Sequence, residues 1–323
     1  MQMRQFGKTG LTASALGFGC WAIGGHSYGP TNDAESVKAL SYAYDCGINF
    51  FDTADIYGEG HSESLVGTVF SPSSKRTQVI LATKCGWDFY QKDKETDKNF
   101  SPEYISFACD KSLKRLNTDY IDLYQLHNPT IDIMQHADIF KALDRLKKQG
   151  KIRFYGISVH TIEEAEFAIS STNASSVQLV VNLIEQEPIT SVFEKAEQQK
   201  TAIIAREPLA CGLLTGKCTP RTIFHKSDHR NRWPRDRYLK LLDQIAVISK
   251  SFDTLKTPLT RAAVEFVIAF SAVSVVIPGM KTIQQVQDHL NAINLKSLSE
   301  EEVGQIQETY LREPIFHQAS TLR

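Results

Sequence analysis

The sequence predicts an α/β chain folded as a (β/α)8 (TIM) barrel. Eight short runs rich in β-branched and aromatic residues alternate with longer segments of helical periodicity. Most of the short runs are continuously apolar, which is typical of strands buried on both faces of a parallel sheet covered by helices. The length of 323 residues suits a single barrel domain over 1–323, because such barrels of about 250 residues or more fold as one unit.

The strands and helices are expected in strict alternation. The expected strands are 15–19, 48–52, 78–84, 120–127, 152–158, 177–182, 202–206 and 273–279. The expected helices are 33–46, 62–70, 101–116, 135–148, 162–170, 189–199, 259–270 and 282–293. Capping residues support several of these bounds, such as Ser101 followed by Pro102 at a helix start and Gly150 just past a helix end.

Further segments are added to the eight repeats. Residues 2–14 are short and punctuated by glycine, which predicts a β-hairpin plugging the bottom of the barrel. Segments 235–252 and 298–311 predict two added helices. The polar connection 211–234 is expected to act as a lid-like loop, and 310–323 is expected to form a C-terminal tail.

Composition excludes several classes of protein. The net charge is −1, with 42% hydrophobic and 23% charged residues, so nothing attracts the whole chain to nucleic acid or to an anionic membrane. An apolar run long enough to span a bilayer is missing, and the first residues do not resemble a secretory signal. The six cysteines contain no C-x-x-C pair. We therefore expect a cytoplasmic protein with a small-molecule partner, and the oligomeric state stays open.

Reactive side chains stand at the ends of three neighbouring strands. Asp52 ends the second strand, with Tyr57 five residues later, Lys84 ends the third and His127 ends the fourth. Active sites of β/α barrels form at this end of the strands, so we expect the four side chains to meet. Taken singly, each fits an ordinary structural role, but a buried lysine needs a partner, and Asp52 supplies one.

This set of side chains suits proton transfer. An ammonium near a phenol stabilises the phenolate and lowers the tyrosine pKa from about 10. His127 can orient a carbonyl oxygen through a hydrogen bond. None of these groups is a reductant, so a cofactor must supply the redox step, and hydride transfer to a carbonyl is the natural reaction.

Several motifs resemble those of the aldo-keto reductase family over nearly the whole chain. They are FDTADIYGEGHSE (51–63), VILATKCG (79–86), DYIDLYQLHNP (119–129), GKIRFYGIS (150–158), PLACGLLTGK (208–217) and VVIPGMKT (275–282). The resemblance places the family's catalytic tetrad on Asp52, Tyr57, Lys84 and His127. It implies reduction of an aldehyde or ketone, sugar-like ones included, to an alcohol or the reverse oxidation, with NADPH or NADH as cofactor and Tyr57 as general acid.

The resemblance also assigns cofactor contacts. Ser158 and Gln178 match the residues that hold the nicotinamide carboxamide, but Val159 and His160 stand where the usual Asn would follow. Arg206 replaces the aromatic that stacks on the nicotinamide. Its guanidinium could stack in turn. Its charge could favour the reduced ring, or it could bind an anionic group of the substrate.

Other matched positions reach the phosphates and the adenosine. The phosphate segment is matched by Leu209, Gly212, Leu213 and Lys217, and the adenosine loop by Gly279, Met280, Lys281 and Thr282. Lys281 suggests a 2′-phosphate and so NADP rather than NAD, although Gln285 and His289 replace the further basic residue and the adenine-contacting Asn.

Substrate contacts are expected from Trp21, Tyr57, Trp87 and His127, with Trp21 also beside the cofactor. Ile23 and Phe89 are further candidates for the pocket walls, although core packing is an equally good account of Ile23. No metal site is expected, because Lys226, Arg230 and Arg232 surround the pair His225 and His229 with positive charge. Two alternatives stay open: a cofactor-binding regulatory subunit, and a dehydratase or epimerase that recycles a tightly bound nucleotide.

Overall fold

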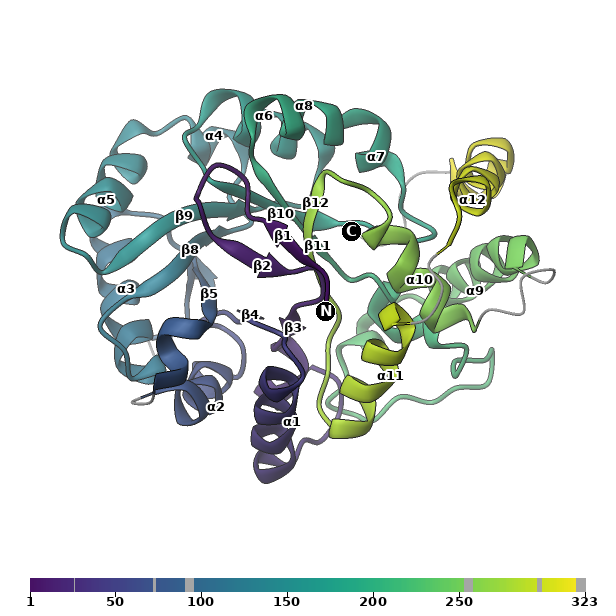
Figure 1. The fold of residues 1–323 in the computed structure, drawn as a ribbon, viewed down its shortest axis with the longest axis horizontal. Helices are drawn as coiled ribbons and strands as arrows, with labels where there is room; N and C mark the ends of the chain where they lie inside the picture. Colours follow the sequence, from purple (N-terminus) through teal and green to yellow (C-terminus); the bar gives the residue numbers. More distant parts are fainter. Residues whose placement is uncertain (26, 72–73, 91–95, 253–257, 295–297, 318–323) are drawn as a thin grey trace.

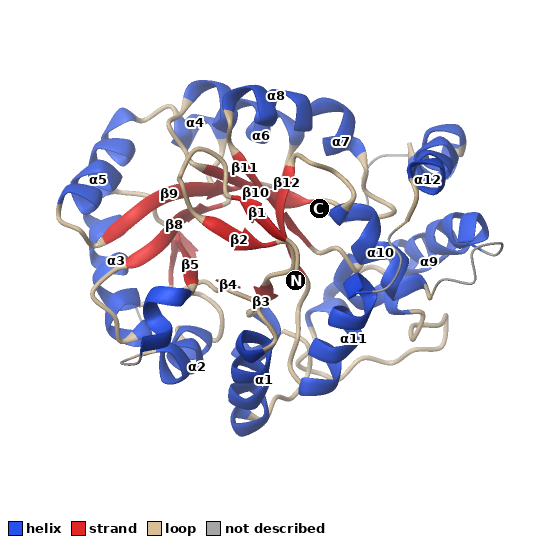
Figure 2. Ribbon diagram, viewed as in Figure 1, coloured by secondary structure: helices blue, strands red, loops and turns tan. Residues whose placement is uncertain are grey.

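A computed structural model describes residues 1–25, 27–71, 74–90, 96–252, 258–294 and 298–317. Parallel strands form a barrel that helices surround on the outside (Figures 1 and 2). Around the barrel the strands are β3 (Phe18–Gly19), β4 (Phe50–Asp52), β5 (Ile80–Cys85), β8 (Ile121–His127), β9 (Ile152–Ser158), β10 (Ser176–Val180), β11 (Ala202–Arg206) and β12 (Val273–Ile277). Parallel bridges from Leu16 to Val276 and from Gly19 to Gly279 close the ring.

The helices follow the strands in the predicted alternation, so the predicted (β/α)8 fold is confirmed. They are α1 (Asp33–Asp45), α2 (His61–Phe70), α3 (Pro102–Leu116), α4 (Ile131–Met134), α5 (Ala137–Lys148), α6 (Ile162–Ser171), α7 (Glu187–Ser191), α8 (Phe193–Gln199), α10 (Leu259–Ile268) and α11 (Ile283–Asn294). The two added helices are α9 (Arg235–Ser249) and α12 (Glu300–Arg312), which contact each other (Figure 1).

Several predicted bounds differ from the structure. The first strand, expected over 15–19, is regular only at its end, because Gly17 and Gly19 pack so closely on β12 that a Cβ at Gly19 would meet the carbonyl of Ile277. The helix expected over 189–199 is divided into α7 and α8 near Val192. Between β5 and α3, β6 (Trp87–Asp88) pairs with β7 (Asp97–Lys98), two short strands that the sequence did not predict, whereas 91–95 lie outside the described residues.

The N-terminal hairpin closes the barrel at the amino ends of the strands. Strand β1 (Met3–Gln5) pairs with β2 (Thr12–Ser14), and Phe6 between them is fully buried. The Phe6 ring lies 5.4 Å from that of Phe50 at the start of β4. Phe6 thus joins the apolar cluster inside the barrel, as the sequence predicts, and leaves the opposite end free for a site.

A second apolar core fills the space between the barrel and the helices. Local caps define the helices that surround it. The Ser101 side chain accepts the amide N–H of Tyr104 at the start of α3, and Thr161 and Glu164 form a capping box at the start of α6. Among the helices of the described residues, we find none long and apolar enough to cross a bilayer. C-terminally, α12 continues to Arg312, and 318–323 of the expected tail lie outside the described residues.

Candidate active site

A large cavity of about 1340 Å³ opens at the carboxyl ends of the strands. It exceeds the roughly 300–1,000 Å³ of most small-molecule sites, so it has room for a long ligand and a second small one. Most of the residues predicted for the site line it: Trp21, Asp52, Tyr57, Trp87, His127, Ser158, Gln178, Arg206, Leu209, Gly212, Lys217, Gly279, Lys281, Gln285 and His289.

Lys84 connects the reactive groups from beneath the cavity. Its side chain is fully buried, and its Nζ donates to Asp52 Oδ1 at 2.5 Å and to the main-chain oxygen of Thr53 at 2.9 Å. The third partner is the Tyr57 hydroxyl, at 3.3 Å. An ammonium, a carboxylate and a phenol from two adjacent strands therefore meet within hydrogen-bond distance, as the sequence predicts.

Two glutamines hold Asp52 in place. Its Oδ2 accepts from Gln125 Nε2 at 3.0 Å and from Gln178 Nε2 at 2.9 Å. We expected Gln178 to hold a cofactor carboxamide. The structure shows that its amide nitrogen is directed to the carboxylate, although the residue also lines the cavity. The Asp52 carboxylate thus accepts hydrogen bonds from three donors, which suits a buried charge.

The Tyr57 loop is tied to its neighbours on two sides. The amides of Thr53 and Asp55 donate to main-chain oxygens of β5. Gly58 has φ +63°, and a Cβ there would meet the carbonyl oxygen of Gly24. The chain after Tyr57 can approach the Trp21–Gly24 turn this closely only because residue 58 is glycine.

The environment of Tyr57 differs from the expectation in one respect. Burial raises the Tyr57 pKa above its ordinary value, and the lowering by the Lys84 ammonium offsets this only in part. The expected net lowering is therefore wrong for the cavity as it stands, because desolvation of the phenolate is the larger effect. Tyr57 is a neutral phenol at neutral pH and can donate a proton.

His127 faces Tyr57 across the same floor. Their rings are 5.9 Å apart in an edge-to-face arrangement. Burial first, and then the charges of Lys84 and Arg206, lower the His127 pKa well below its usual value. The imidazole is therefore neutral, and its buried Nδ1 has no hydrogen-bond partner among the described residues. A neutral imidazole next to a phenol can hold a carbonyl oxygen between them.

The sequence that forms this barrel and its site matches the model of a known family. The model of the aldo/keto reductase family matches residues 15–311. The chain belongs to the aldo/keto reductase family. As a member, it is an oxidoreductase that uses a nicotinamide cofactor to interconvert carbonyl compounds and alcohols. None of the comparisons favours the regulatory-subunit or cofactor-recycling alternatives.

Related aldo-keto reductases match along their whole length. Aldo-keto reductase YhdN of Bacillus subtilis is 31% identical, covering 98% of this chain and 96% of that protein. The holo form of an aldo-keto reductase from Bacillus halodurans is 31% identical with a TM-score of 0.81, covering 96% of each chain.

The names of two further relatives indicate different cofactors. Aldo-keto reductase yakc [NADP(+)] of Schizosaccharomyces pombe is 32% identical over 92% of this chain and 88% of its own length. The NADH-specific methylglyoxal reductase of Escherichia coli is 27% identical, with 91% and 94% covered. Membership in this family therefore leaves NADP or NAD undecided.

Asn128 is a site residue that our sequence reasoning missed. It lines the cavity directly after His127 with φ +60°. Its Oδ1 accepts from the Ser158 hydroxyl at 3.0 Å, and its amide N–H donates to the Ser158 carbonyl at 2.9 Å. Val159, by contrast, is fully buried in the core. Asn128, which follows β8, thus lies beside Ser158 of β9. Its position next to His127 was the only feature of the sequence that could have indicated a role in the site.

Arg206 also lines the cavity at the end of β11. Its guanidinium pairs with Glu207 and donates to the Val159 carbonyl at 3.3 Å and to His160 Nδ1 at 3.2 Å. Burial, and then the charge of Arg206, lower the His160 pKa to about 4, so this imidazole is neutral as well.

The far half of the cavity is rich in cations. Its lining includes Lys217, Arg230, Arg232, Arg261 and Lys281. Arg261, which sequence reasoning missed, stands in the first turn of α10 and pairs with Glu265. Lys281 Nζ donates to the main-chain oxygen of Tyr28 at 2.9 Å. Charge of this kind suits phosphate groups.

The 211–234 segment crosses toward the Trp21–Gly24 turn. The amide N–H of His229 donates to the Ser27 carbonyl at 2.9 Å, and its ring lies 4.8 Å from Trp21 and 4.7 Å from Tyr28. Arg230 is held by Asp228 at 2.7 Å and reaches the Cys211 carbonyl at 3.0 Å. Whether this segment moves as the expected lid stays a prediction.

Four predicted contacts with apolar side chains do not line the cavity, and neither does Thr282, whose hydroxyl accepts the main-chain N–H of Gln285. Leu213 and Met280 are packed in the core between barrel and helices, as is Ile23, for which core packing is therefore the better account. Phe89 stacks on Tyr90 at 4.2 Å instead of lining the entrance. Their apolar side chains pack against other apolar or aromatic groups, and the positions of these residues in the sequence did not reveal this packing.

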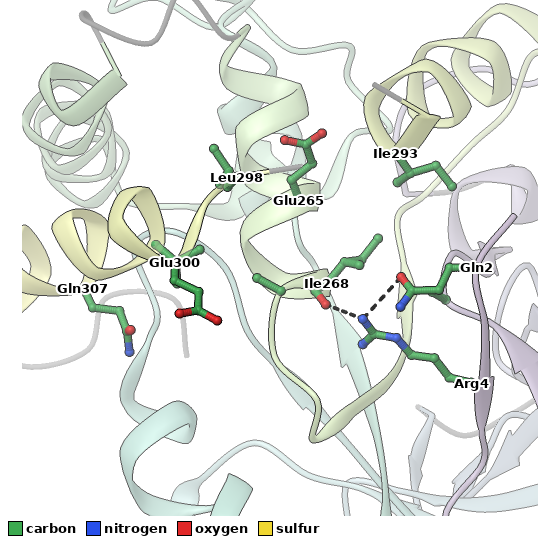
Figure 3. A pocket seen from close by; sticks show the side chains of 11 residues that line it. Gln2, Arg4, Glu265, Ile268, Ile293, Leu298, Glu300 and Gln307 are labelled. Carbon is green, nitrogen blue, oxygen red and sulfur yellow. Dashed lines mark hydrogen bonds between the residues drawn. The ribbon is translucent and has the colours of Figure 1, made fainter. Parts of the chain in front are cut away.

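A smaller cavity of about 480 Å³ lies between β1 and helices α10–α12 (Figure 3). Arg4 extends into its wall, where its guanidinium donates to the main-chain oxygens of Ile268, Phe270 and Val273. Residues predicted for the active site do not occur in its lining. Within the described residues, no cluster of three or more His, Cys, Asp or Glu could hold a metal ion.

Proposed function

We propose that this protein reduces small aldehydes or ketones with NADP(H), and that Tyr57 donates the proton to the carbonyl oxygen. One observation carries the proposal: the buried Lys84 Nζ bonds both Asp52 and the Tyr57 hydroxyl at the floor of the large cavity. A free-standing tyrosine would be a poor acid at neutral pH, and this connection supplies the missing electrostatic support.

Each residue of the tetrad has a separate role in the reaction. Tyr57 gives its proton to the carbonyl oxygen, and the Lys84 ammonium stabilises the phenolate that remains. Asp52 keeps Lys84 charged: burial alone would lower the Lys84 pKa, but the Asp52 carboxylate and the Tyr57 hydroxyl raise it above the ordinary value. Neutral His127 donates to the same oxygen and orients the carbonyl. When bound, NADPH supplies a hydride to the carbonyl carbon.

The described residues fit such a cofactor. Uncharged hydrogen-bonding side chains, Asn128, Ser158 and Gln178, come from the carboxyl side of β8, β9 and β10, whereas the cations other than Arg206 come from the segment after β11, from α10 and from the loop after β12. A dinucleotide needs this order, with a neutral nicotinamide at one end and phosphates at the other. The buried Nδ1 atoms of His127 and His289 have no hydrogen-bond partner among the described residues.

NADP rather than NAD is favoured by the charge at the adenosine end. Lys281 and Arg261 both line the cavity there, next to Gln285 and His289. Gln285 accepts the main-chain N–H of Lys281 at 2.7 Å and so orders the loop. Burial lowers the His289 pKa to about 4, which leaves it a neutral partner for an adenine.

The proposal is tested by steady-state assays of a panel of aldehydes, sugars and keto acids with NADPH and NADH side by side. We expect turnover of at least one carbonyl class, with kcat/KM for NADPH exceeding that for NADH by about tenfold or more, as one added charge-assisted contact implies. Turnover with NADH alone would contradict the cofactor assignment. Nucleotide binding without any turnover would contradict the enzymatic one.

A further inference from the structure

Arg206 places a cation where the reaction changes the charge of the cofactor. It is the last residue of β11, paired with Val180 on β10 and Ile277 on β12, and its side chain lines the cavity. Its charge is felt at both proton-handling groups, since it contributes to lowering the pKa of Tyr57 and of His127. Its guanidinium also donates to the carbonyl of Val159, which follows Ser158, and the Ser158 hydroxyl donates to Asn128 beside His127. Arg206 is therefore close to the point where carbonyl and nicotinamide must meet.

The guanidinium is held stationary. One nitrogen is paired with Glu207, and another donates to the Val159 carbonyl and to His160. Only 16% of the Arg206 side chain is exposed. Its Nε is buried without a hydrogen-bond partner among the described residues, and both terminal nitrogens are engaged, so bidentate binding of a substrate carboxylate would require breaking at least one of these contacts. The charge of Arg206 therefore acts from a fixed place, as part of the wall.

Its partner does not remove that charge from the site. The Glu207 carboxylate also lines the cavity and accepts the Cys211 thiol at 3.2 Å, but Arg206 is the member of the pair whose charge acts on both Tyr57 and His127. The other full charges on the floor, Lys84 and Asp52, form their own pair. With His127 and His160 neutral, Arg206 adds to the positive field of Lys84 at the reacting end.

Carbonyl reduction delivers a hydride to the carbonyl carbon and a proton from Tyr57 to its oxygen, and it leaves one positive charge on the nicotinamide ring. We propose that Arg206 is a redox-state discriminator: its fixed charge weakens binding of the oxidised, cationic nicotinamide relative to the reduced, neutral one. The inference rests on the proposed function and deepens it. An enzyme so built releases its oxidised cofactor readily and resists inhibition by it.

The test measures equilibrium dissociation constants for NADPH and NADP⁺, with NADH and NAD⁺ in parallel, by quenching of tryptophan fluorescence, since Trp21 and Trp87 line the cavity. We expect the wild-type protein to bind NADPH at least about tenfold more tightly than NADP⁺, the order expected for a partly compensated charge a few ångströms away. Arg206→Gln should lower that ratio about tenfold, chiefly by tightening NADP⁺.

Two variants separate charge from position. Arg206→Lys keeps the charge and should retain most of the ratio. Arg232→Gln removes a cation from the cation-rich half and should weaken both nucleotides alike, leaving the ratio unchanged. Thermal melting checks that each variant is folded.

The inference is overturned if Arg206→Gln leaves the ratio of the two dissociation constants unchanged, or if Arg206→Lys lowers it as much as Arg206→Gln does. Failure of the proposed function is a different result. It would appear in the wild-type protein, as absence of nucleotide binding or of turnover with every carbonyl tested, before any variant is compared.

Discussion

At the scale of single residues, the site depends on a buried ion pair that serves both stability and chemistry. Lys84 is fully buried and Asp52 nearly so, and the carboxylate is further bonded by Gln125 and Gln178. Breaking a buried pair from one side leaves an uncompensated charge, which is far more costly than losing both partners. The pair therefore has a thermodynamic signature that can be separated from its catalytic one.

Asp52→Asn should destabilise the protein by about 3–5 kcal/mol in urea unfolding, because it leaves the Lys84 ammonium without its carboxylate. The double variant Asp52→Asn, Lys84→Met should recover most of that stability and still lack turnover. Asp138→Asn, which removes an exposed partner of Lys141, is the control and should leave the unfolding midpoint unchanged. An unchanged midpoint for Asp52→Asn would contradict the account of the pair.

The pKa directions predict the pH profile of reduction. Tyr57 must be protonated to donate, and its pKa lies above the ordinary 10.0, so kcat/KM should stay level through neutral pH and fall only in alkaline solution. His127, with a pKa well below 6.5, is neutral throughout that range and should produce no acid limb near 6.5. An acid limb at that pH, measured at saturating cofactor, would contradict the neutral state of His127 in the enzyme–cofactor complex.

Residue-scale prediction from the sequence succeeded where a polar side chain ends an apolar strand, as with Asp52, Lys84 and His127. The prediction failed where burial in the folded protein decides which side chains reach the cavity. Leu213 has the right place in the chain, yet its side chain is buried in the core. Asn128 was missed because its partner Ser158 is thirty positions away, and such proximity follows from strand pairing and not from local pattern.

At the scale of elements, the β4–α2 loop decides where Tyr57 points. Gly58, in the left-handed region, packs against Gly24, and this contact joins the Tyr57 loop to the turn that carries Trp21. The Trp21 and Tyr57 rings stack at 6.0 Å as a result. The Tyr57 loop and the Trp21–Gly24 turn therefore hold each other in position.

Gly58→Ala should lower kcat by about tenfold or more, because the new methyl collides with the Gly24 carbonyl and displaces Tyr57. Gly10→Ala is a matched control: Gly10 has φ +75°, and a Cβ there has no atom within 4 Å. It carries the same kind of backbone strain far from the site. Equal kcat values for the two variants would show that the contact does not position Tyr57.

The order of elements could be predicted because strands and helices differ in period and length, but their irregularities could not. β3 is short because two glycines allow β12 to approach closely, a tertiary cause. The hairpin of β6 and β7 lies in a segment of mixed charge that resembles an exposed loop, although Phe100 at its end is buried.

At the scale of the whole molecule, the cations that line the cavity besides Arg206 come from the segment after β11, from α10 and from the loop after β12. Lys281→Gln should raise the dissociation constant of NADPH about tenfold and leave that of NADH nearly unchanged, because only NADPH carries the extra phosphate. Lys147→Gln on the outer face of α5 is the control. Parallel weakening of both nucleotides would show that Lys281 acts only by holding Tyr28 and its loop.

The family could be predicted because its motifs are long, and the barrel could be predicted because strands and helices alternate regularly along the sequence. The closure of the cavity was not, since it brings His229 against Ser27 across some two hundred positions.

The central claim is that Tyr57 is the proton donor of a nicotinamide-dependent carbonyl reductase. Tyr57→Phe tests it most directly, through single-turnover oxidation of bound NADPH by a carbonyl that the wild-type protein reduces. We predict a rate lower by about 10²- to 10⁴-fold, with a dissociation constant for NADPH close to that of the wild type. A reduction rate near that of the wild-type protein would contradict the claim.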